Sequence, residues 1–308
     1  MITYYKNNKG LILTEKFEEN CWINAVCPTQ EEIHYLLHEL KIPQAFYNDI
    51  EDIDERPRIE TEDGWNLIII RIPFKTNDKK LPFNTAPLGL MFKEDVFVSL
   101  CFNQTDILSD FVTYTQRKNI SIKNHFDLIL KLLLSSSIWF LKYLKQINQR
   151  IKLAEDNLEK SIKNEELQAL FQIEKCLVFF ITSLKGNDIL FRRIKNLKNH
   201  SETFDIDLLE DVEIELRQAE ETTLIYNNIL TGMMDAYASV ISNNLNVIMK
   251  RLTSISIILM IPTLVASLYG MNVPNNLEEN TYGFLIVILF SLVVSIFGVF
   301  LFKKKNMF

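Results

Sequence analysis

Two long apolar segments near the C-terminus constrain this chain more than any other feature of its sequence. No charged side chain occurs from Leu252 to Asn272, or again from Gly283 to Phe302. Each segment has about 20 residues, and a helix of that length spans roughly 30 Å, the thickness of the hydrocarbon core of a bilayer. We therefore expect transmembrane helices at residues 252–272 and 283–302, joined by an external loop at residues 273–282.

The basic residues that flank these segments predict their orientation. Lys250 and Arg251 precede the first segment, a basic tail at residues 303–308 follows the second, and the loop between them carries two glutamates and no basic residue. Lysine and arginine are retained on the cytoplasmic side of a membrane. We expect a multi-pass protein of the cell (inner or plasma) membrane, without a signal peptide, and with both termini in the cytoplasm.

The first part of the chain is predicted to be a cytoplasmic α/β domain at residues 1–123. Six of the eight prolines precede residue 90, and the segments CWINAVCP, WNLIIIRIPF and DVFVSLCF are rich in strand-forming residues. The LIII run is typical of a strand buried on both faces, so helices should cover both sides of the sheet. Thr29 and Glu32 predict a helix start, and Asp63-Gly64 predicts a hairpin.

Residues 124–251 are expected to form a cytoplasmic helical region and stalk, because they contain no proline and only two glycines. The pattern predicts a chain reversal near Asn164 and a break near Gly186. A last helix should start near Asp207 and continue unbroken to Tyr269. The expected fold class is therefore an α+β membrane protein. A net charge of -6 gives no support to binding of nucleic acid.

One face of this last helix is polar along its length. Positions three or four residues apart, counted back from Gly270, carry mostly hydroxyl, amide, carboxylate or thioether groups, whereas most other positions in the apolar segment are aliphatic. Small polar residues serve helix packing in membranes, and polar faces also line pores. Because this face continues into the cytoplasmic region, we favour a pore. Its candidate lining residues are Asp235, Asn246, Met249, Thr253, Ser256, Met260 and Thr263. One helix cannot enclose a channel, so a pore requires a homo-oligomer with this helix innermost.

The residues Tyr269-Gly270-Met271-Asn272 end the first apolar segment, and a lysine-rich tail follows the second. In this arrangement the chain resembles the CorA family of magnesium transporters, over its whole length in layout and most closely from about Asp211 to the end. The resemblance implies a homopentameric, channel-like transporter with a cytoplasmic funnel. Mg2+ would be both the transported ion and a regulator, with Co2+ and Ni2+ as further candidate ions. No enzymatic activity and no organic cofactor are expected.

The resemblance also implies roles for individual residues. Gly270, Met271 and Asn272 would form the outer mouth, where amide oxygens accept hydrogen bonds from the water shell that Mg2+ gives up reluctantly. Met249 and Leu252 would form a hydrophobic constriction that closes by dewetting.

The cytoplasmic stretch from Glu202 to Glu221 carries nine carboxylates and one arginine. This pattern is typical of a solvated helix face, and it also fits a sensor in which Mg2+ bridges neighbouring subunits. The resemblance assigns Asp211 to that sensor. The family's second acid has no direct counterpart: Thr76 stands near its place, and Asp78, two residues on, is the candidate partner.

Transport needs no ATP, and the chain has no nucleotide-binding signature. Two charges that move down an inside-negative potential gain about 4.6 kcal/mol per 100 mV.

Three alternatives stay open. His34 and His38, four residues apart on a predicted helix, allow zinc binding and point to a zinc transporter of the same superfamily. A membrane-anchored sensor is the second, and a hydrolase that uses His125 or His200 is the weakest.

Overall fold

The computed structural model describes residues 1–18, 21–78, 81–160, 164–197, 205–271 and 281–305. Contacts between residues divide the chain into two compact units, residues 1–232 and residues 233–308, and each is described by itself. The boundary falls inside one long helix, α6 (Ile206–Tyr269).

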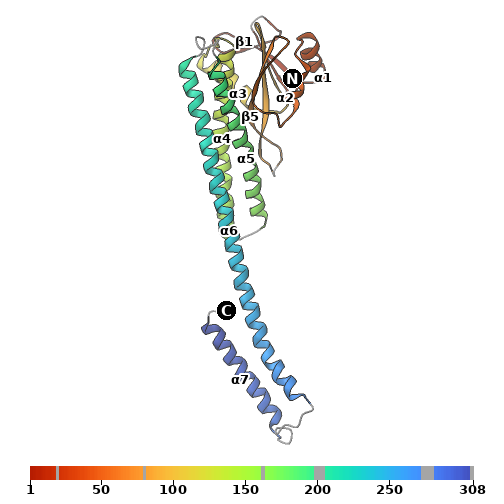
Figure 1. Cartoon of the computed structure of the whole chain (residues 1–308), viewed down its shortest axis with the longest axis vertical. Helices are drawn as coiled ribbons and strands as arrows, with labels where there is room; N and C mark the ends of the chain where they lie inside the picture. Colours follow the sequence, from red (N-terminus) through yellow and green to blue (C-terminus); the bar gives the residue numbers. More distant parts are fainter. Residues whose placement is uncertain (19–20, 79–80, 161–163, 198–204, 272–280, 306–308) are drawn as a thin grey trace. The chain divides into compact units, whose positions relative to one another are not determined.

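The first unit contains a seven-stranded sheet in the order β2-β1-β3-β7-β6-β5-β4 (Figure 1). Neighbouring strands are antiparallel except β3 and β7, which are parallel. The strands are β1 (Ile2–Asn7), β2 (Leu11–Thr14), β3 (Cys21–Val26), β4 (Arg58–Glu62), β5 (Trp65–Lys75), β6 (Phe83–Lys93) and β7 (Val96–Cys101). The three strands predicted from the sequence are confirmed as β3, β5 and β7.

The predicted hairpin joins β4 to β5. Asp63 has a φ of 51° and Gly64 a φ of 76°. A two-residue hairpin loop of the favoured type needs positive φ at both central positions, which glycine and aspartate tolerate better than most residues. The turn therefore sets the register in which Glu62 pairs with Trp65.

One face of the sheet is covered by α1 (Gln30–His34), the π-helical turn η1 (Tyr35–Glu39) and α2 (Gln44–Glu51). The predicted helix start is confirmed: Thr29 Oγ1 accepts a hydrogen bond from the Glu32 N–H, and the Glu32 carboxylate accepts one from the Thr29 N–H. Apolar side chains of these helices and of the strands form one buried cluster, which includes Leu36, Phe46, Ile50, Leu67, Ile69, Met91 and Leu100.

The helices α4 (His125–Lys160) and α5 (Asn164–Lys195) pack against β5 and β6, and α3 (Ile107–Lys118) packs against α4 and β2 (Figure 1). Phe140 of α4 and Phe180 of α5 meet edge to face, with ring centroids 4.9 Å apart. Strand β5 is buried at every position from Leu67 to Phe74. The prediction that helices cover both faces of the sheet is confirmed.

A buried arginine ties the sheet to these two helices. The Arg71 N–H donates to Asn187 Oδ1 at 2.8 Å, and Asn187 Nδ2 donates back to the Arg71 carbonyl at 2.8 Å. Ser136 of α4 donates to the same carbonyl, and the guanidinium donates to Thr85 Oγ1 at 2.7 Å. Burial lowers the pKa of the Arg71 guanidinium, and nearby carboxylates oppose that shift. Such a network is stable only because its polar groups have partners.

The expected break near Gly186 is wrong, because α5 continues through this residue to Lys195. A Cβ atom at Gly186 would lie 2.8 Å from Cγ of Pro57. The glycine is therefore explained by the close approach of α5 to the loop before β4. The contact outweighs the cost of about 1 kcal/mol that glycine brings to a helix interior.

The long last helix is confirmed as α6, which has 64 residues and begins one residue before the expected start. Its first half buries a stripe of side chains in the first unit: Val212, Leu216, Ala219, Thr223 and Leu230. The spacing of three, four or seven residues keeps these side chains on one face of the helix.

We expect Gly186→Ala to destabilise the protein by about 1–3 kcal/mol, because the added methyl group meets a proline ring that has no flexible end to move aside. Gly232→Ala is the matched control: it lies in α6 with no atom within 4 Å of the added Cβ, and the change should stabilise by up to about 1 kcal/mol. Thermal unfolding of the detergent-solubilised full chain measures both. Equal stabilisation by the two substitutions would contradict the close contact.

Candidate functional site

The second unit contains the rest of α6, from Met233, and α7 (Gly283–Lys304). The two helices run side by side in opposite directions (Figure 1). A Cβ atom at Gly298 of α7 would lie 3.4 Å from Ile261 Cδ1 and 3.9 Å from Ile258 Cγ1 of α6. Ser254 of α6 is fully buried, and Ser291 of α7 is nearly so. Small residues let helices approach closely in lipid, and these residues define the side of α6 that α7 covers.

The predicted polar face lies on the other side of α6. Thr263 is nine residues from the buried Ser254, which is about two and a half turns at roughly 3.6 residues per turn and places the two on opposite sides. The side chains of Thr263 and Met260 are exposed, and Ser256 is partly exposed. Asp235, Asn246, Met249, Leu252 and Thr253 are also exposed. All eight candidate pore-lining residues are thus left at least partly uncovered by α7 and by the rest of the chain.

The hydroxyl groups on this face donate within their own helix. Ser256 Oγ donates to the Leu252 carbonyl at 2.9 Å, and Thr263 Oγ1 donates to the Leu259 carbonyl at 3.1 Å. Their donors are therefore satisfied in an apolar surrounding. The oxygen lone pairs are left for an outside donor, such as a water molecule.

The motif at the end of α6 is described only in part. The helix ends at Tyr269, and the Gly270 N–H donates to the Ala266 carbonyl at 2.9 Å. A Cβ atom at Gly270 would lie 3.2 Å from that oxygen, a tight contact that glycine avoids. Met271 is exposed. Asn272 lies outside the described residues, as does most of the loop after it.

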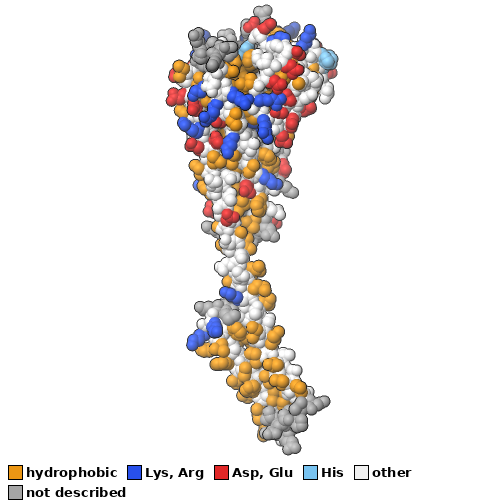
Figure 2. Space-filling view, in the orientation of Figure 1, with side chains coloured by type: hydrophobic (Ala, Val, Ile, Leu, Met, Phe, Trp, Pro, Cys, Tyr) orange, Lys and Arg blue, Asp and Glu red, His pale blue; other side chains and the backbone are white. Residues whose placement is uncertain are grey.

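In the part of the chain that the structure describes, three helices are long and apolar enough to cross a membrane: α5, α6 and α7. In α5 the apolar side chains Leu177, Phe180 and Leu184 are buried within the first unit, and Asn187 is bonded to the sheet. In α7 almost every apolar side chain is exposed. Figure 2 shows hydrophobic side chains over much of the second unit, whereas acidic ones gather on the first. Exposed apolar side chains are therefore concentrated on α6 and α7.

The two candidate regulatory acids are exposed on different elements of the first unit. Asp211 lies in the first part of α6, and Asp78 lies between β5 and β6. Among the described residues, Asp211 forms no ion pair and no group of three or more metal-ligating side chains occurs. The single chain therefore offers no complete cation site at these positions.

Other carboxylates of the same acidic stretch are engaged within the chain. Lys123 lies 2.8 Å from Asp205, and Lys195 of α5 lies 2.7 Å from Glu213. The hydrogen bond from Lys123 lowers the pKa of Asp205, and the hydrogen bond from Lys195 lowers the pKa of Glu213. The sequence pattern did not reveal this division, because the two lysines are 82 and 18 residues away from their partners.

The histidines carry no assembled site in the described part of the chain. The rings of His34 and His38 lie with centroids 4.3 Å apart, and no third ligand accompanies them. His125 Nε2 lies 2.7 Å from the Glu94 carbonyl, a contact that involves no nucleophile. His200 lies outside the described residues.

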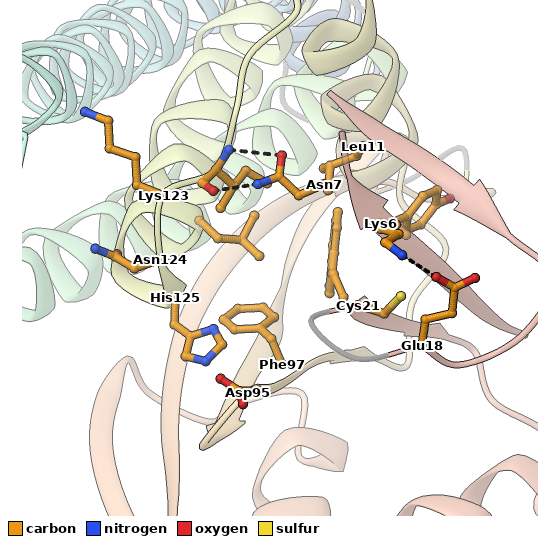
Figure 3. A pocket seen from close by; sticks show the side chains of 14 residues that line it. Lys6, Asn7, Leu11, Glu18, Cys21, Asp95, Phe97, Lys123, Asn124 and His125 are labelled. Carbon is orange, nitrogen blue, oxygen red and sulfur yellow. Dashed lines mark hydrogen bonds and ion pairs between the residues drawn. The ribbon is translucent and has the colours of Figure 1, made fainter. Parts of the chain in front are cut away.

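A cavity of about 770 Å3 lies beside the start of α4 (Figure 3). Lys6 and Glu18, which line it, form an ion pair, and Asn7 exchanges hydrogen bonds with the backbone of Ile122. Lys123, another lining residue, is paired with Asp205. Because these polar groups already have partners, the cavity is a weaker candidate for function than α6.

Comparison with known proteins agrees with this geometry. The family model described as "CorA-like Mg2+ transporter protein" matches residues 17–304. A protein named cobalt/magnesium transport protein CorA, from Methanocaldococcus jannaschii, is 24% identical over 290 residues, which are 92% of this chain and 90% of that protein. A protein named magnesium transport protein CorA, from Helicobacter pylori, is 25% identical over 331 aligned positions, with 99% of each chain covered.

A solved structure shares the fold. The structure described as the complete CorA magnesium transporter from Methanocaldococcus jannaschii superposes with a TM-score of 0.83 at 21% identity, covering 100% of this chain and 99% of that one. The predicted α+β membrane fold is confirmed, with an N-terminal α/β region, a long helix and apolar C-terminal helices.

The Lys195–Glu213 pair predicts a pH-dependent effect. Glu213→Gln should lower stability at pH 7 by at most about 1 kcal/mol, because both side chains are partly exposed. The pKa of Glu213 is below its ordinary value of 4.5 in the folded state, so the contribution is complete above that pH and is lost as the pH falls further. Unfolding curves at a series of pH values from 7 down to 2 measure it, with Glu215→Gln as control. A deficit that stays unchanged over the whole series would argue against the pair.

Proposed function

The chain belongs to the family of CorA-like Mg2+ transporters, and on this premise we propose that it carries Mg2+ into the cytoplasm through a pore formed by several copies of α6. The family is one of ion transporters and not of enzymes. The observation that carries the proposal is the division of α6 into a side covered by α7 and an opposite, uncovered polar side. Co2+ is a second candidate ion, because one relative is named for both cobalt and magnesium.

The need for several copies follows from the uncovered face. A membrane supplies no hydrogen-bond donors to the oxygen lone pairs of Ser256 and Thr263, whereas water in a shared pore does. Rotational symmetry places the same face of each α6 around one axis and leaves α7 outside, toward lipid. Five copies are expected from the resemblance to the family. Both ends of the chain would lie in the cytoplasm, as the flanking basic residues predict.

An ion that enters from outside would meet three zones in turn. The ring of Asn272 amides would hold the hydrated ion at the mouth by hydrogen bonds to its water. Ser256, Met260 and Thr263 would line the middle. Met249 and Leu252 would close the inner end when the pore is narrow, because an apolar constriction excludes water.

Beyond that constriction, Asn246 and Asp235 present oxygen atoms on the cytoplasmic side, where an acid attracts the arriving cation.

The membrane potential supplies the driving force. A divalent cation gains about 4.6 kcal/mol per 100 mV, at about 2.3 kcal/mol per charge. At about 1.4 kcal/mol per factor of ten, this supports roughly a thousandfold accumulation.

Cytoplasmic Mg2+ would regulate the pore through Asp211 and Asp78 of neighbouring copies. Asp211 is exposed and forms no ion pair in the described part of the chain, whereas Asp205 and Glu213 are held by lysines. A bound Mg2+ would bridge these two carboxylates and hold the closed state. When internal Mg2+ falls, the carboxylates repel one another and the closed state loses stability.

Flux in liposomes tests the transport proposal. With a magnesium-sensitive dye inside and an inside-negative potassium diffusion potential, the protein should admit Mg2+ without ATP, and Asn272→Ala should abolish entry. The same preparation is tested with zinc and a pH gradient. Zinc entry with protons while Mg2+ stays out would move the function to zinc transport. No flux of any ion through intact oligomers would favour a membrane-anchored sensor.

A matched pair of cysteines tests the polar face in the same liposomes. In a cysteine-free background, Thr263→Cys should react with a water-soluble cationic thiol reagent and block flux. Ile255→Cys is exposed in the single chain but lies about 80° from Thr263 around the helix and farther from the centre of the polar face, so it should react at least tenfold more slowly. Equal reactivity of the two positions would contradict a pore on this face.

We expect Asp211→Lys to weaken closure by cytoplasmic Mg2+. The purified oligomer should be protected from protease by Mg2+, and the variant should need at least about tenfold more Mg2+ for half protection, which corresponds to about 1.4 kcal/mol. Glu221→Lys, an equal charge change on the same helix, is the control. Unchanged protection in the Asp211 variant would reject the sensor.

A further inference from the structure

Another cavity of the first unit, of about 730 Å3, lies at the end of the sheet where the parallel strands β3 and β7 finish. Its lining comes from β1, from the ends of β3 and β5, from the segment between β7 and α3, from the first turn of α3 and from one side chain of α4. Ligands of open α/β sheets bind beyond the carboxyl ends of parallel strands. A cavity of this size is typical of sites for small organic molecules.

One lining side chain is a buried tyrosine whose hydroxyl group has no partner. Tyr143 of α4 is 3% exposed, and its ring packs against Phe83 and Trp139, with centroids 5.0 Å and 5.3 Å away. The hydroxyl group forms no hydrogen bond with any residue that the structure describes. Burial, and to a smaller extent the Asp106 carboxylate, raises the pKa of Tyr143 to about 12, so the hydroxyl group keeps its proton. Buried polar groups normally have partners, and an acceptor in the cavity would supply one.

The start of α3 adds two donors to the same cavity. Leu108 and Ser109, in the first turn, line it, and their N–H groups form no hydrogen bond with a described residue. The Ile107 N–H, by contrast, donates to Thr105 Oγ1 at 3.2 Å. The first N–H groups of a helix lack acceptors within the helix, and together with the helix dipole they favour anions such as phosphate.

The lining carries one basic and one acidic side chain. Lys75, the last residue of β5, is exposed and forms no ion pair with a described residue. Asp106 is the N-cap residue of α3, and its carboxylate caps no backbone N–H of that helix. Asn24 is 7% exposed, and its Nδ2 donates only to Thr3 Oγ1, at 3.4 Å. The cavity therefore offers a cation and several donors, and also a carboxylate that can accept.

We infer that this cavity binds a phosphorylated metabolite with free hydroxyl groups, a sugar phosphate or a nucleoside monophosphate. The phosphate group pairs with Lys75 and accepts hydrogen bonds from Tyr143 and from the start of α3. The hydroxyl groups of the ligand donate to Asp106. A lipid does not suit a lining that is mostly polar, and inorganic phosphate leaves Asp106 without a donor. The inference goes beyond transport and does not depend on it, because every lining residue belongs to the first unit.

Calorimetric titration of the detergent-solubilised full chain tests the inference in buffer without Mg2+, so that chelation of Mg2+ contributes no heat. The probes are glucose 6-phosphate and adenosine monophosphate, each compared with its unphosphorylated parent and with inorganic phosphate. At least one monoester should bind about tenfold or more tightly than both its parent and inorganic phosphate. The monoester that binds identifies the skeleton. Absence of binding by both, or equal binding of inorganic phosphate, would overturn the inference.

Two substitutions test the assigned contacts. Tyr143→Phe keeps the ring and removes the unpartnered hydroxyl group, so the melting temperature of the free protein should not fall, whereas affinity for the ligand should fall by about fivefold or more. Lys75→Gln should lower the affinity by about fivefold. Tyr114→Phe and Lys118→Gln make the same changes at exposed positions of α3 outside the cavity and should bind like the wild type. A lower melting temperature of Tyr143→Phe with unchanged affinity would assign the hydroxyl group a structural role and contradict the inference.

Cys27 reports binding at the cavity itself. It lines the cavity, and it is exposed whereas the other three cysteines of the chain are buried. Saturating ligand should slow the alkylation of Cys27 by N-ethylmaleimide by about fivefold or more, as followed by mass spectrometry of the intact chain. Tyr143→Phe should show less protection at the ligand concentration that half-saturates the wild type. Calorimetric saturation without any protection of Cys27 would place the ligand elsewhere and overturn the inference.

Discussion

The packing of α7 against one side of α6 is the interaction on which the proposed pore depends. Ser254 is buried in this contact, and Gly298 allows the helices to approach. A membrane offers no hydrogen-bond partner to polar groups, so each polar side chain in a span needs a protein or water neighbour. The side of α6 that α7 leaves uncovered carries several such groups. That asymmetry points to further copies of the chain around a water-filled path.

The first unit is connected to the packing of α6 and α7 by the first half of α6. Val212 and Leu216 are buried against the rest of the unit, and Asp205 and Glu213 are bonded to lysines outside α6. These contacts engage one set of carboxylates and leave Asp211 exposed. A cation bound between copies would therefore act on α6, which is already packed within its own chain. A small rearrangement at the acidic surface would act on the same helix that lines the proposed pore.

Most elements followed from local sequence signals. Strand β5 was predicted from a run of β-branched residues, the hairpin from Asp63-Gly64, and the start of α1 from Thr29 and Glu32, because each signal acts between residues close in the chain. The break expected at Gly186 was wrong for the converse reason. Propensity describes the cost of glycine in an isolated helix, whereas Pro57, distant in the sequence, decides that only glycine fits there.

By itself, the sequence determined the two apolar helices, the polar face of α6 and the family resemblance at Gly270-Met271-Asn272. Length, helical period and a motif between two spans are all properties of consecutive residues. Only the tertiary structure decided which serine is covered by α7, which carboxylates are paired with lysines, and how Arg71 joins the sheet to α5. Those facts depend on which surfaces meet, and residues far apart in the chain meet only after it has folded.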